Sequence, residues 1–148
     1  MIPVPVESIL RYKGDTVWSI GPDASVYQAV RVMAERSIGA LPVIANGELV
    51  GILTERDYAR KVALQSRSSK DTAVGEIMTT PVVSVSPDQT VEECMRIMTH
   101  ARIRHLPVID RGQVVGIVSI GDLVRKVVVA QSEIIQQLHA YISGRPSA

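Results

Sequence analysis

The chain has 148 residues, of which 46% are hydrophobic and 21% are charged, and its formal net charge at pH 7 is +1. This composition is typical of one compact soluble domain. It argues against DNA or RNA binding, which needs several clustered cations. The longest aliphatic run is too short to cross a bilayer, and the first residues lack the pattern of a secretory signal. We therefore expect a cytoplasmic protein with no nucleic acid or membrane partner.

The sequence contains an internal duplication. Residues 17–62 align without a gap to residues 82–127, and 20 of these 46 positions are identical. One unit of this size buries too little surface to be comfortably stable alone, whereas two can cover each other's apolar faces. We expect two repeats with pseudo-two-fold symmetry and a cleft between them. The predicted boundaries are 6–65 for the first repeat with its lead-in helix, 66–73 for a polar linker, 74–130 for the second repeat, and 131–148 for a C-terminal helix and tail.

The first half of each repeat is predicted to contain a strand and a helix. The lead-in 6–10 resembles residues 74–78, and a β-like run follows it at 17–20 and at 82–85. A Pro-Asp pair ends each run. Apolar side chains then recur at helical spacing, which indicates a helix with one buried stripe. They are Val26, Val30 and Met33 in the first copy, and Val91, Met95 and Met98 in the second.

The second half of each repeat is predicted to be a hairpin followed by a helix. Asn46-Gly47 separates two apolar runs, which is a strong signal for a two-residue β-turn. The second copy has Arg111-Gly112 there, where we expect the glycine alone to supply a positive φ. A helix is expected to begin near Thr54 and near Ser119. Each repeat is thus β-α-β-β-α, and the fold class is α/β (α+β).

The C-terminal segment is predicted to be an amphipathic helix. Ile134, Leu138 and Tyr141 fall on one helical stripe. The stripe can pack on its own domain or on a partner chain, and the sequence favours neither.

The strongest local motif is a hydroxyl and a carboxylate three residues apart, and it occurs in both repeats. Thr54 precedes Asp57, and Ser119 precedes Asp122, each pair where a strand gives way to a helix. This spacing is typical of a capping box. The alternative is a ligand site, in which the helix N-terminus and the hydroxyl hold a phosphate and the carboxylate takes both hydroxyls of a ribose. An upstream glycine in each copy would let the ligand approach the backbone.

The two copies differ just before their second strand. Arg104-His105 stands in the second copy where the first has Gly39-Ala40. These two side chains are either ordinary solvated charges or the positive charge for a phosphate.

Nothing in the sequence indicates catalysis. Cys94 aligns with Ala29 on an apolar helical face, so we expect a buried hydrophobe rather than a reactive thiol. The three histidines match no nucleophile or metal-binding pattern, and the two repeated aspartates belong to separate clefts. We expect no enzyme activity and no obligatory cofactor.

The chain resembles the CBS-domain pair, also called the Bateman module, over about residues 6–129. The resemblance rests on Ile38-Gly39-Ala40-Leu41-Pro42-Val43, on Ile103-Arg104-His105-Leu106-Pro107-Val108, and on the two segments from glycine to aspartate, 51–57 and 116–122. It is similar to small stand-alone members of bacteria and of plant organelles.

The resemblance implies two clefts that bind adenosyl compounds such as AMP, ADP, ATP, NAD(H) or S-adenosylmethionine. Asp57 and Asp122 would hold ribose hydroxyls, and Thr54 and Ser119 would contact the ribose-phosphate part. An apolar base pocket would come from the opposite copy. The implied lining is Val17, Trp18, Ile38 and Ala40 around Ser119 and Asp122, and Thr80, Val82, Val83 and Ile103 around Thr54 and Asp57, with Gly39, Pro42, Arg104, His105 and Pro107 also in the binding motifs. We expect the Ser119/Asp122 cleft to be the tighter site for a phosphorylated ligand.

The predicted function is that of a regulatory module that senses adenine nucleotides or dinucleotides and signals to an unidentified target protein. The family implies a homodimer formed through helices. One alternative is a structural adaptor with degenerate clefts, and another is a redox regulator acting on thioredoxin-type partners.

Overall fold

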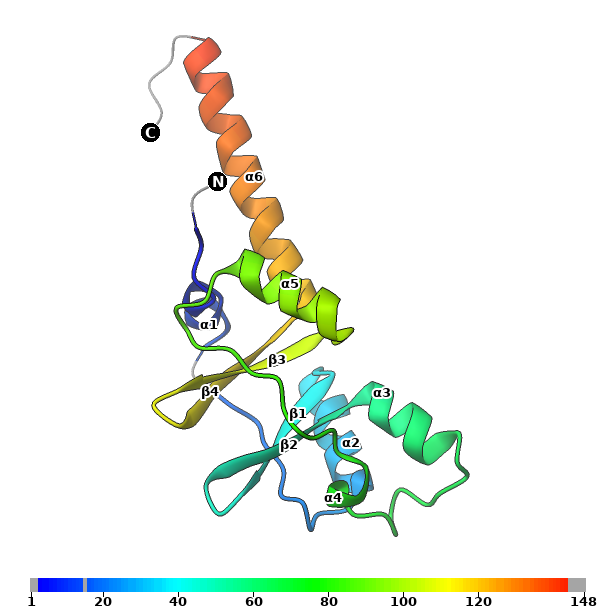
Figure 1. The fold of residues 1–148 in the computed structure, drawn as a ribbon. Coiled ribbons are helices and arrows are strands. Elements are labelled where there is room, and N and C mark those ends of the chain that lie inside the picture. The colour runs from blue at the N-terminus through cyan, green and yellow to red at the C-terminus, as the bar shows by residue number, and fades with distance from the viewer. Residues whose placement is uncertain (1–2, 15, 144–148) are drawn as a thin grey trace.

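The computed structural model describes residues 3–14 and 16–143, which form two similar halves (Figure 1). The elements in chain order are α1 (Glu7–Lys13), α2 (Val26–Arg36), β1 (Ala40–Ala45), β2 (Glu48–Thr54), α3 (Glu55–Tyr58), the π-helical turn η1 (Ala59–Ala63), α4 (Val74–Ile77), α5 (Val91–Ala101), β3 (His105–Asp110), β4 (Gln113–Ser119) and α6 (Ile120–Ile142). The predicted α/β (α+β) class with two repeats is confirmed.

The helices α2 and α5 form as their apolar spacing predicts. Each begins at a hydroxyl N-cap, Ser25 or Thr90, which accepts a hydrogen bond from the backbone N–H three residues later. Each buries one stripe against its own hairpin. The α5 stripe includes Cys94, which is fully buried, and burial raises the pKa of its thiol to about 11. The thiol is therefore protonated at neutral pH, which fits the predicted role of a buried hydrophobe.

Each half contains an antiparallel hairpin with a two-residue turn, β1 with β2 and β3 with β4. Asn46 and Gly47 have φ of 53° and 79°, and Arg111 and Gly112 have 52° and 77°. The expectation that Gly112 alone takes a positive φ is therefore wrong. Two successive positive φ angles give the turn whose twist matches that of the paired strands, so Arg111 adopts a left-handed conformation as well.

The predicted strands 17–20 and 82–85 are each reduced to a single parallel bridge. The Ile20 N–H donates to the Pro42 carbonyl at 3.1 Å, and the Ile44 N–H donates to the Ile20 carbonyl at 2.9 Å. The next hydrogen bonds of the ladder would need N–H groups at Pro22 and Pro42, and proline has none. Prolines stand at the matching positions of the second repeat, and it also forms one bridge, between Val85 and Val108.

The lead-in helices are exchanged between the halves (Figure 1). Val6 and Ile9 of the α1 region lie in the core of the second half, whereas Val74 and Ile77 of α4 lie in the core of the first. The exchange ties the two halves together. It also means that α1, which precedes the first repeat in the chain, completes the core of the second.

Two strand glycines make room for this exchange. A Cβ on Gly116 would come within 2.6 Å of Leu10 Cδ2, and a Cβ on Gly51 within 2.5 Å of Met78 Sδ. The space beside each glycine is thus filled by a side chain of the lead-in region. Gly116 also lines the Asp122 cleft, whereas Gly51 does not line the Asp57 cleft. The expectation that the upstream glycine lets a ligand approach the backbone therefore does not hold for Gly51, and it stays a prediction for Gly116.

The helix α6 has 23 residues and joins the last helix of the second repeat to the C-terminal segment without a break. Its outer part projects from the two halves (Figure 1). None of the helices in the described part of the chain combines the length and apolar character that a membrane crossing requires.

Candidate functional site

Two clefts lie between the halves, and each contains one of the repeated aspartates. The Asp122 cleft has a volume of about 600 Å³, and the Asp57 cleft about 490 Å³. Both volumes fall in the range of small-molecule sites. Gly39, Glu55 and His105 line both clefts, so the clefts adjoin each other where the halves meet.

A capping box forms the floor of each cleft. The Asp122 N–H donates to Ser119 Oγ at 3.1 Å, and the Ser119 N–H donates to Asp122 Oδ2 at 2.8 Å. In the other repeat, Thr54 and Asp57 make the same pair of bonds at 3.1 and 3.0 Å. The capping-box interpretation is confirmed. It does not use up the carboxylates, because each ionised carboxylate can accept about four hydrogen bonds.

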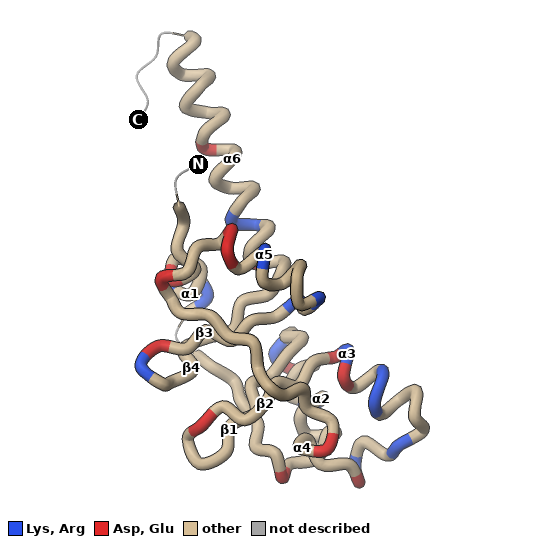
Figure 2. Tube along the Cα trace, in the orientation of Figure 1, with Lys and Arg blue, Asp and Glu red and all other residues tan. Residues whose placement is uncertain are grey.

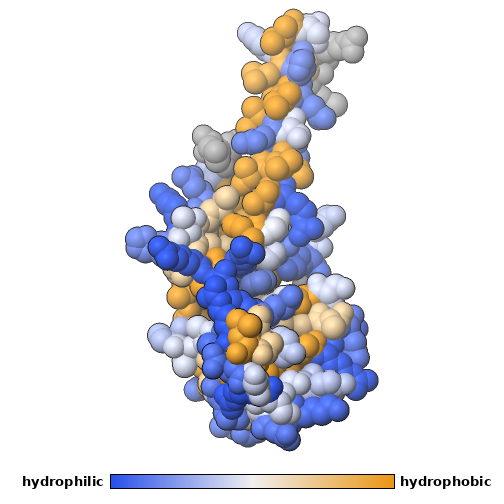
Figure 3. All heavy atoms as spheres, turned by 90° about the vertical axis from the view of Figure 1, so that its right-hand side faces the viewer, coloured by the Kyte–Doolittle hydropathy of each residue, from blue (hydrophilic) through white to orange (hydrophobic). Residues whose placement is uncertain are grey.

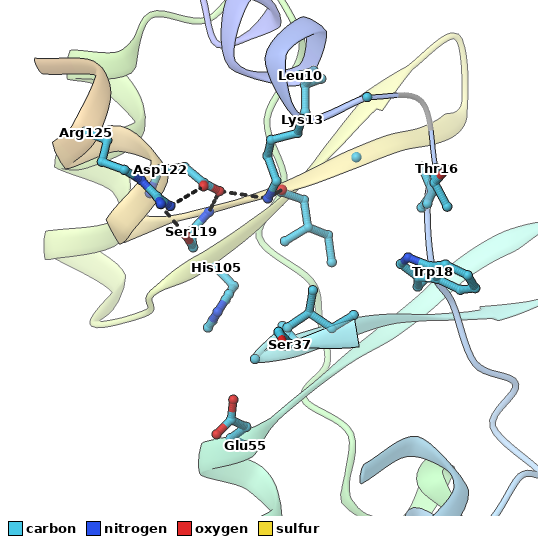
Figure 4. A pocket seen from close by; sticks show the side chains of 17 residues that line it. Leu10, Lys13, Thr16, Trp18, Ser37, Glu55, His105, Ser119, Asp122 and Arg125 are labelled. Carbon is cyan, nitrogen blue, oxygen red and sulfur yellow. Dashed lines mark hydrogen bonds and ion pairs between the residues drawn. The ribbon is translucent and has the colours of Figure 1, made fainter. Parts of the chain in front are cut away.

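Two cations also bond to the Asp122 carboxylate (Figure 4). Lys13 Nζ donates to Asp122 Oδ2 at 2.8 Å and to the Ile117 carbonyl at 2.9 Å, and Arg125 Nη2 donates to Asp122 Oδ1 at 3.0 Å. Burial alone would raise the pKa of Asp122, but the hydrogen bonds from Lys13 and the Ser119 backbone outweigh it and lower that pKa below its ordinary value. Asp122 is therefore ionised at neutral pH.

Asp57 is held in a similar way by different groups. Its Oδ1 accepts from Thr79 Oγ1 at 2.9 Å and from Lys61 Nζ at 3.0 Å, and Lys61 also donates to the Ile77 carbonyl at 2.9 Å. Each aspartate thus binds a lysine that also contacts a backbone carbonyl. The two lysines are not related by the duplication, because Lys13 comes from the lead-in helix and Lys61 from the turn after Asp57.

The Asp57 cleft carries the larger positive charge. Its lining includes Arg56, Arg60, Lys61 and Arg104, whereas the cations lining the Asp122 cleft are Lys13 and Arg125, both bonded to Asp122. Within the described ranges, Arg60 and Arg104 form no ion pair. Among the residues that the structure describes, excess positive charge is therefore available for an anion in the Asp57 cleft and not in the Asp122 cleft.

Arg104 lies in the cleft opposite to the one predicted. Its carbonyl accepts from the Ile120 N–H at 2.9 Å, which fixes the backbone beside its own repeat. Arg104 nevertheless lines the Asp57 cleft and not the Asp122 cleft. The charge argument for the Ser119/Asp122 cleft as the tighter phosphate site is therefore wrong, because Arg104 adds its charge to the other cleft.

His105 lies at the boundary of the two clefts and is not a cation at neutral pH. Figure 4 shows its ring and the Glu55 carboxylate pointing toward each other. A Cβ on Gly39 would lie 3.0 Å from Glu55 Oε1 and 3.1 Å from His105 Nε2, so both atoms border the same small space. Burial lowers the pKa of His105, and Glu55 only partly opposes this. In the ligand-free chain His105 therefore adds little positive charge to either cleft at neutral pH.

Most of the predicted apolar lining lies where it was expected. Val17, Trp18, Ile38 and Ala40 line the Asp122 cleft, and Val83 and Ile103 line the Asp57 cleft. Thr80 and Val82 do not line the Asp57 cleft, and their neighbours Thr79 and Pro81 do. Pro42 and Pro107 are buried inside β1 and β3 and line neither cleft.

Trp18 supplies an aromatic wall of the Asp122 cleft. The Arg36 guanidinium lies 3.9 Å from the centre of its ring, which is the geometry of a cation–π contact. Trp18 is the only tryptophan in the chain. Its fluorescence is therefore a probe of this cleft.

Several residues that line the clefts were not predicted from the sequence. Lys61 and Arg125 follow their aspartates by four and three residues, so helical spacing could have identified them. Lys13 reaches Asp122 across 109 positions of the chain, and no local pattern predicts that contact.

The repeats match a known family model. The model of the CBS domain matches residues 11–64 and again 74–129. The chain belongs to the CBS domain family. It contains two CBS domains, as the resemblance in the sequence implied.

Individual relatives support the same assignment. The chain is 48% identical to the mitochondrial CBS domain-containing protein CBSX3 of Arabidopsis thaliana over 136 residues, which are 88% of this chain and 66% of that protein. A solved CBS-domain protein from Burkholderia ambifaria MC40-6 is 50% identical, with a TM-score of 0.82 over 86% of this chain and 96% of that one. The CBS domain pair of protein MJ0100, solved with 5′-methylthioadenosine and S-adenosyl-L-methionine, is 28% identical, with a TM-score of 0.75 over 85% of this chain and 97% of that one.

Proposed function

We propose that this CBS pair is a regulatory module that binds adenosyl nucleotides, such as AMP, ADP, ATP or NAD(H), in its two clefts. The observation that carries the proposal is the repeated floor of a capping hydroxyl and a carboxylate, faced by apolar side chains of the opposite half. The adenosyl ligands of the MJ0100 domain pair support the ligand class.

The proposed binding mode follows from the groups available. A ribose has two neighbouring hydroxyls, and an aspartate can accept a hydrogen bond from each. In either cleft these hydroxyls would replace the lysine that now bonds the carboxylate. The base would lie against the apolar wall, which is Trp18 and Ile38 in one cleft and Val83 and Ile103 in the other.

The charge distribution supports a proposal of different phosphate chains for the two clefts. In the Asp57 cleft, Arg60 and Arg104 are available to a di- or triphosphate. In the Asp122 cleft, Lys13 and Arg125 already neutralise Asp122, so a ligand with one phosphate or none fits better. We propose that the Asp57 cleft is the tighter ATP site. Ligand binding would change the contacts of the chain with a partner, either a second copy or a target protein.

A thermal-shift panel tests this function. AMP, ADP, ATP and NAD(H) are added singly to the wild type and to the double variant Asp57→Ala, Asp122→Ala. A ligand present at 100 times its dissociation constant is expected to stabilise the wild-type fold by about 2.7 kcal/mol and to raise its melting temperature. The double variant is expected to show no shift. The absence of any wild-type shift, together with the absence of calorimetric heat, would contradict the proposal and favour the adaptor.

A further inference from the structure

The outer part of α6 carries an unpartnered apolar seam. Residues on one face follow each other at alternating spacings of four and three, the pattern of a coiled-coil core. They are Val124, Val128, Gln131, Ile135, Leu138 and Ile142. The five apolar side chains are between 45% and 81% exposed. Figure 3 shows the hydrophobic surface extending along the projecting helix.

Nothing in the described part of the chain covers this seam. The last α6 residue that packs against either core is Val127. Leu138 and Tyr141 remain 56% and 85% exposed, so the tail does not pack on its own domain. A contiguous apolar face of this kind marks an interface, and a helical extension of about 15 residues is marginally stable alone.

The charges on α6 indicate what covers the seam. Beyond Lys126, Glu133 is the only charged residue of the helix (Figure 2). A helix that lies on anionic lipid carries many lysines and arginines on its polar face, and this one carries none there. A charged partner helix would be selected by charges that flank the seam. With neither present, the surface that the seam matches best is its own copy.

We propose that α6 pairs in parallel with α6 of a second copy of this chain through this seam. The single polar seam residue decides the direction. In a parallel pair Gln131 lies opposite Gln131, and the two amides can hydrogen-bond to each other. In an antiparallel pair of the same register Gln131 would lie against Ile135, where its buried amide has no partner. A lone polar residue at such a position fixes register in helix pairs.

The same helix connects the seam to a cleft. The N-cap Ser119 and the first-turn residue Asp122 belong to the Asp122 cleft, and the seam begins at Val124. The seam is thus a surface through which ligand binding in the Asp122 cleft could change chain contacts, and this link rests on the proposed function. The test of the pairing needs no ligand, so the pairing can fail while the nucleotide proposal stands, and the reverse is also true.

Sedimentation analysis of the full chain tests the pairing. Leu138→Glu places a charge in the seam but keeps a good helix former, and Gln137→Glu adds the same charge on the opposite side of the helix. The wild type and Gln137→Glu are expected to dimerise alike, whereas Leu138→Glu weakens dimerisation at least about tenfold. Circular dichroism and the melting temperature check that each variant folds. A wild type that stays monomeric at high concentration, or that sediments with anionic vesicles instead, would overturn the proposal, as would equal dimerisation of the two variants.

Disulfide trapping tests the direction. Under mild oxidation Leu138→Cys is expected to give a covalent dimer, because residue 138 faces its own copy in a parallel pair. Glu133→Cys, on the far side of the helix, and the wild type, whose Cys94 is buried, are the controls and are expected to stay uncoupled. Coupling that requires Val128→Cys in one chain and Leu138→Cys in the other would overturn the parallel arrangement.

Discussion

The two clefts share a floor but differ in how their aspartates are held. Asp57 is bonded by Lys61, four residues along the same stretch of chain, whereas Asp122 is bonded by Lys13 from the exchanged lead-in helix. The duplication has copied what neighbouring residues encode, namely the cap and the carboxylate. Arg60 and Lys61 recur as Arg125 and Lys126, but the lysine that bonds the aspartate is Lys61 in the first half and Lys13, from a distant part of the chain, in the second. The clefts are therefore similar in chemistry and unequal in charge.

Because different lysines bond the two aspartates, ligand binding is expected to have different consequences in the two clefts. A ligand that replaces Lys61 alters contacts within the core of the first half, to Asp57 and to the Ile77 carbonyl. A ligand that replaces Lys13 breaks an ion pair between α1 and α6, and so acts on the helix that carries the exposed seam. Occupancy of the Asp122 cleft is thus expected to be the event that changes chain contacts.

The largest expected effect is the loss of ATP affinity in one cleft at a time, when the aspartate of that cleft is removed. Asp57→Ala and Asp122→Ala are each expected to reduce affinity for ATP in their own cleft about 100-fold, because two hydrogen bonds to a charged group are lost at about 1.5 kcal/mol or more each. Calorimetry measures both affinities in each variant. Asp57→Asn and Asp122→Asn are matched controls of equal size. Unchanged affinity in both alanine variants would contradict the ribose assignment.

Removing the phosphate cation should affect one cleft only. Arg104→Ala is expected to weaken ATP binding in the Asp57 cleft about tenfold and to leave adenosine binding unchanged, because adenosine has no phosphate. Arg102→Ala, which removes a neighbouring arginine that does not line the cleft, is the control. Equal losses for ATP and adenosine would show that Arg104 only shapes the loop.

Removing the internal lysine should favour a neutral ligand. In Lys13→Ala the ribose no longer competes with an ammonium for Asp122, so adenosine binding in the Asp122 cleft is expected to strengthen a few fold. Trp18 fluorescence follows that cleft. The free energy of unfolding should fall only slightly, because a partly exposed ion pair contributes about 0–1 kcal/mol. Lys13→Arg keeps the charge and serves as the control; weaker adenosine binding in Lys13→Ala would contradict the competition.

The smallest expected effect is on the pH dependence of stability, and it comes from His105 at the boundary of the two clefts. The pKa of His105 is lower in the folded chain than the value of about 6.5 in the unfolded chain. Below pH 6.5 the unfolded state binds more protons, so stability is complete above that pH and falls as the pH drops through the window toward the folded pKa. Denaturant unfolding at several pH values measures this slope. His105→Gln is expected to flatten it, and an unchanged slope would contradict the assignment to His105.

The elements with a local signal were predicted from sequence, and those set by long-range contacts were not. The helical stripes around Met33 and Met98 and both hairpins are encoded by spacing and turn residues. The predicted strands 17–20 and 82–85 form only one bridge each, because Pro42 and Pro107 have no N–H to donate to them. The pattern of apolar residues does not reveal this. The likeness of residues 6–10 to residues 74–78 was visible in the sequence, but not which half each of the two segments packs against.

The floor of each cleft was predictable and its charge was not. Thr54, Asp57, Ser119 and Asp122 stand at fixed offsets in the sequence. The side chain of Arg104 lies where the halves meet, so its cleft depends on how the repeats pack.

The most direct test of two unequal clefts is a titration of ATP into the wild type followed by Trp18 fluorescence. Because Trp18 lines only the Asp122 cleft, the first equivalent of ATP is expected to bind in the Asp57 cleft with heat but little change in fluorescence. The fluorescence change should come later, as the weaker cleft fills. A full fluorescence change with the first equivalent would contradict the assignment of the tighter ATP site to the Asp57 cleft.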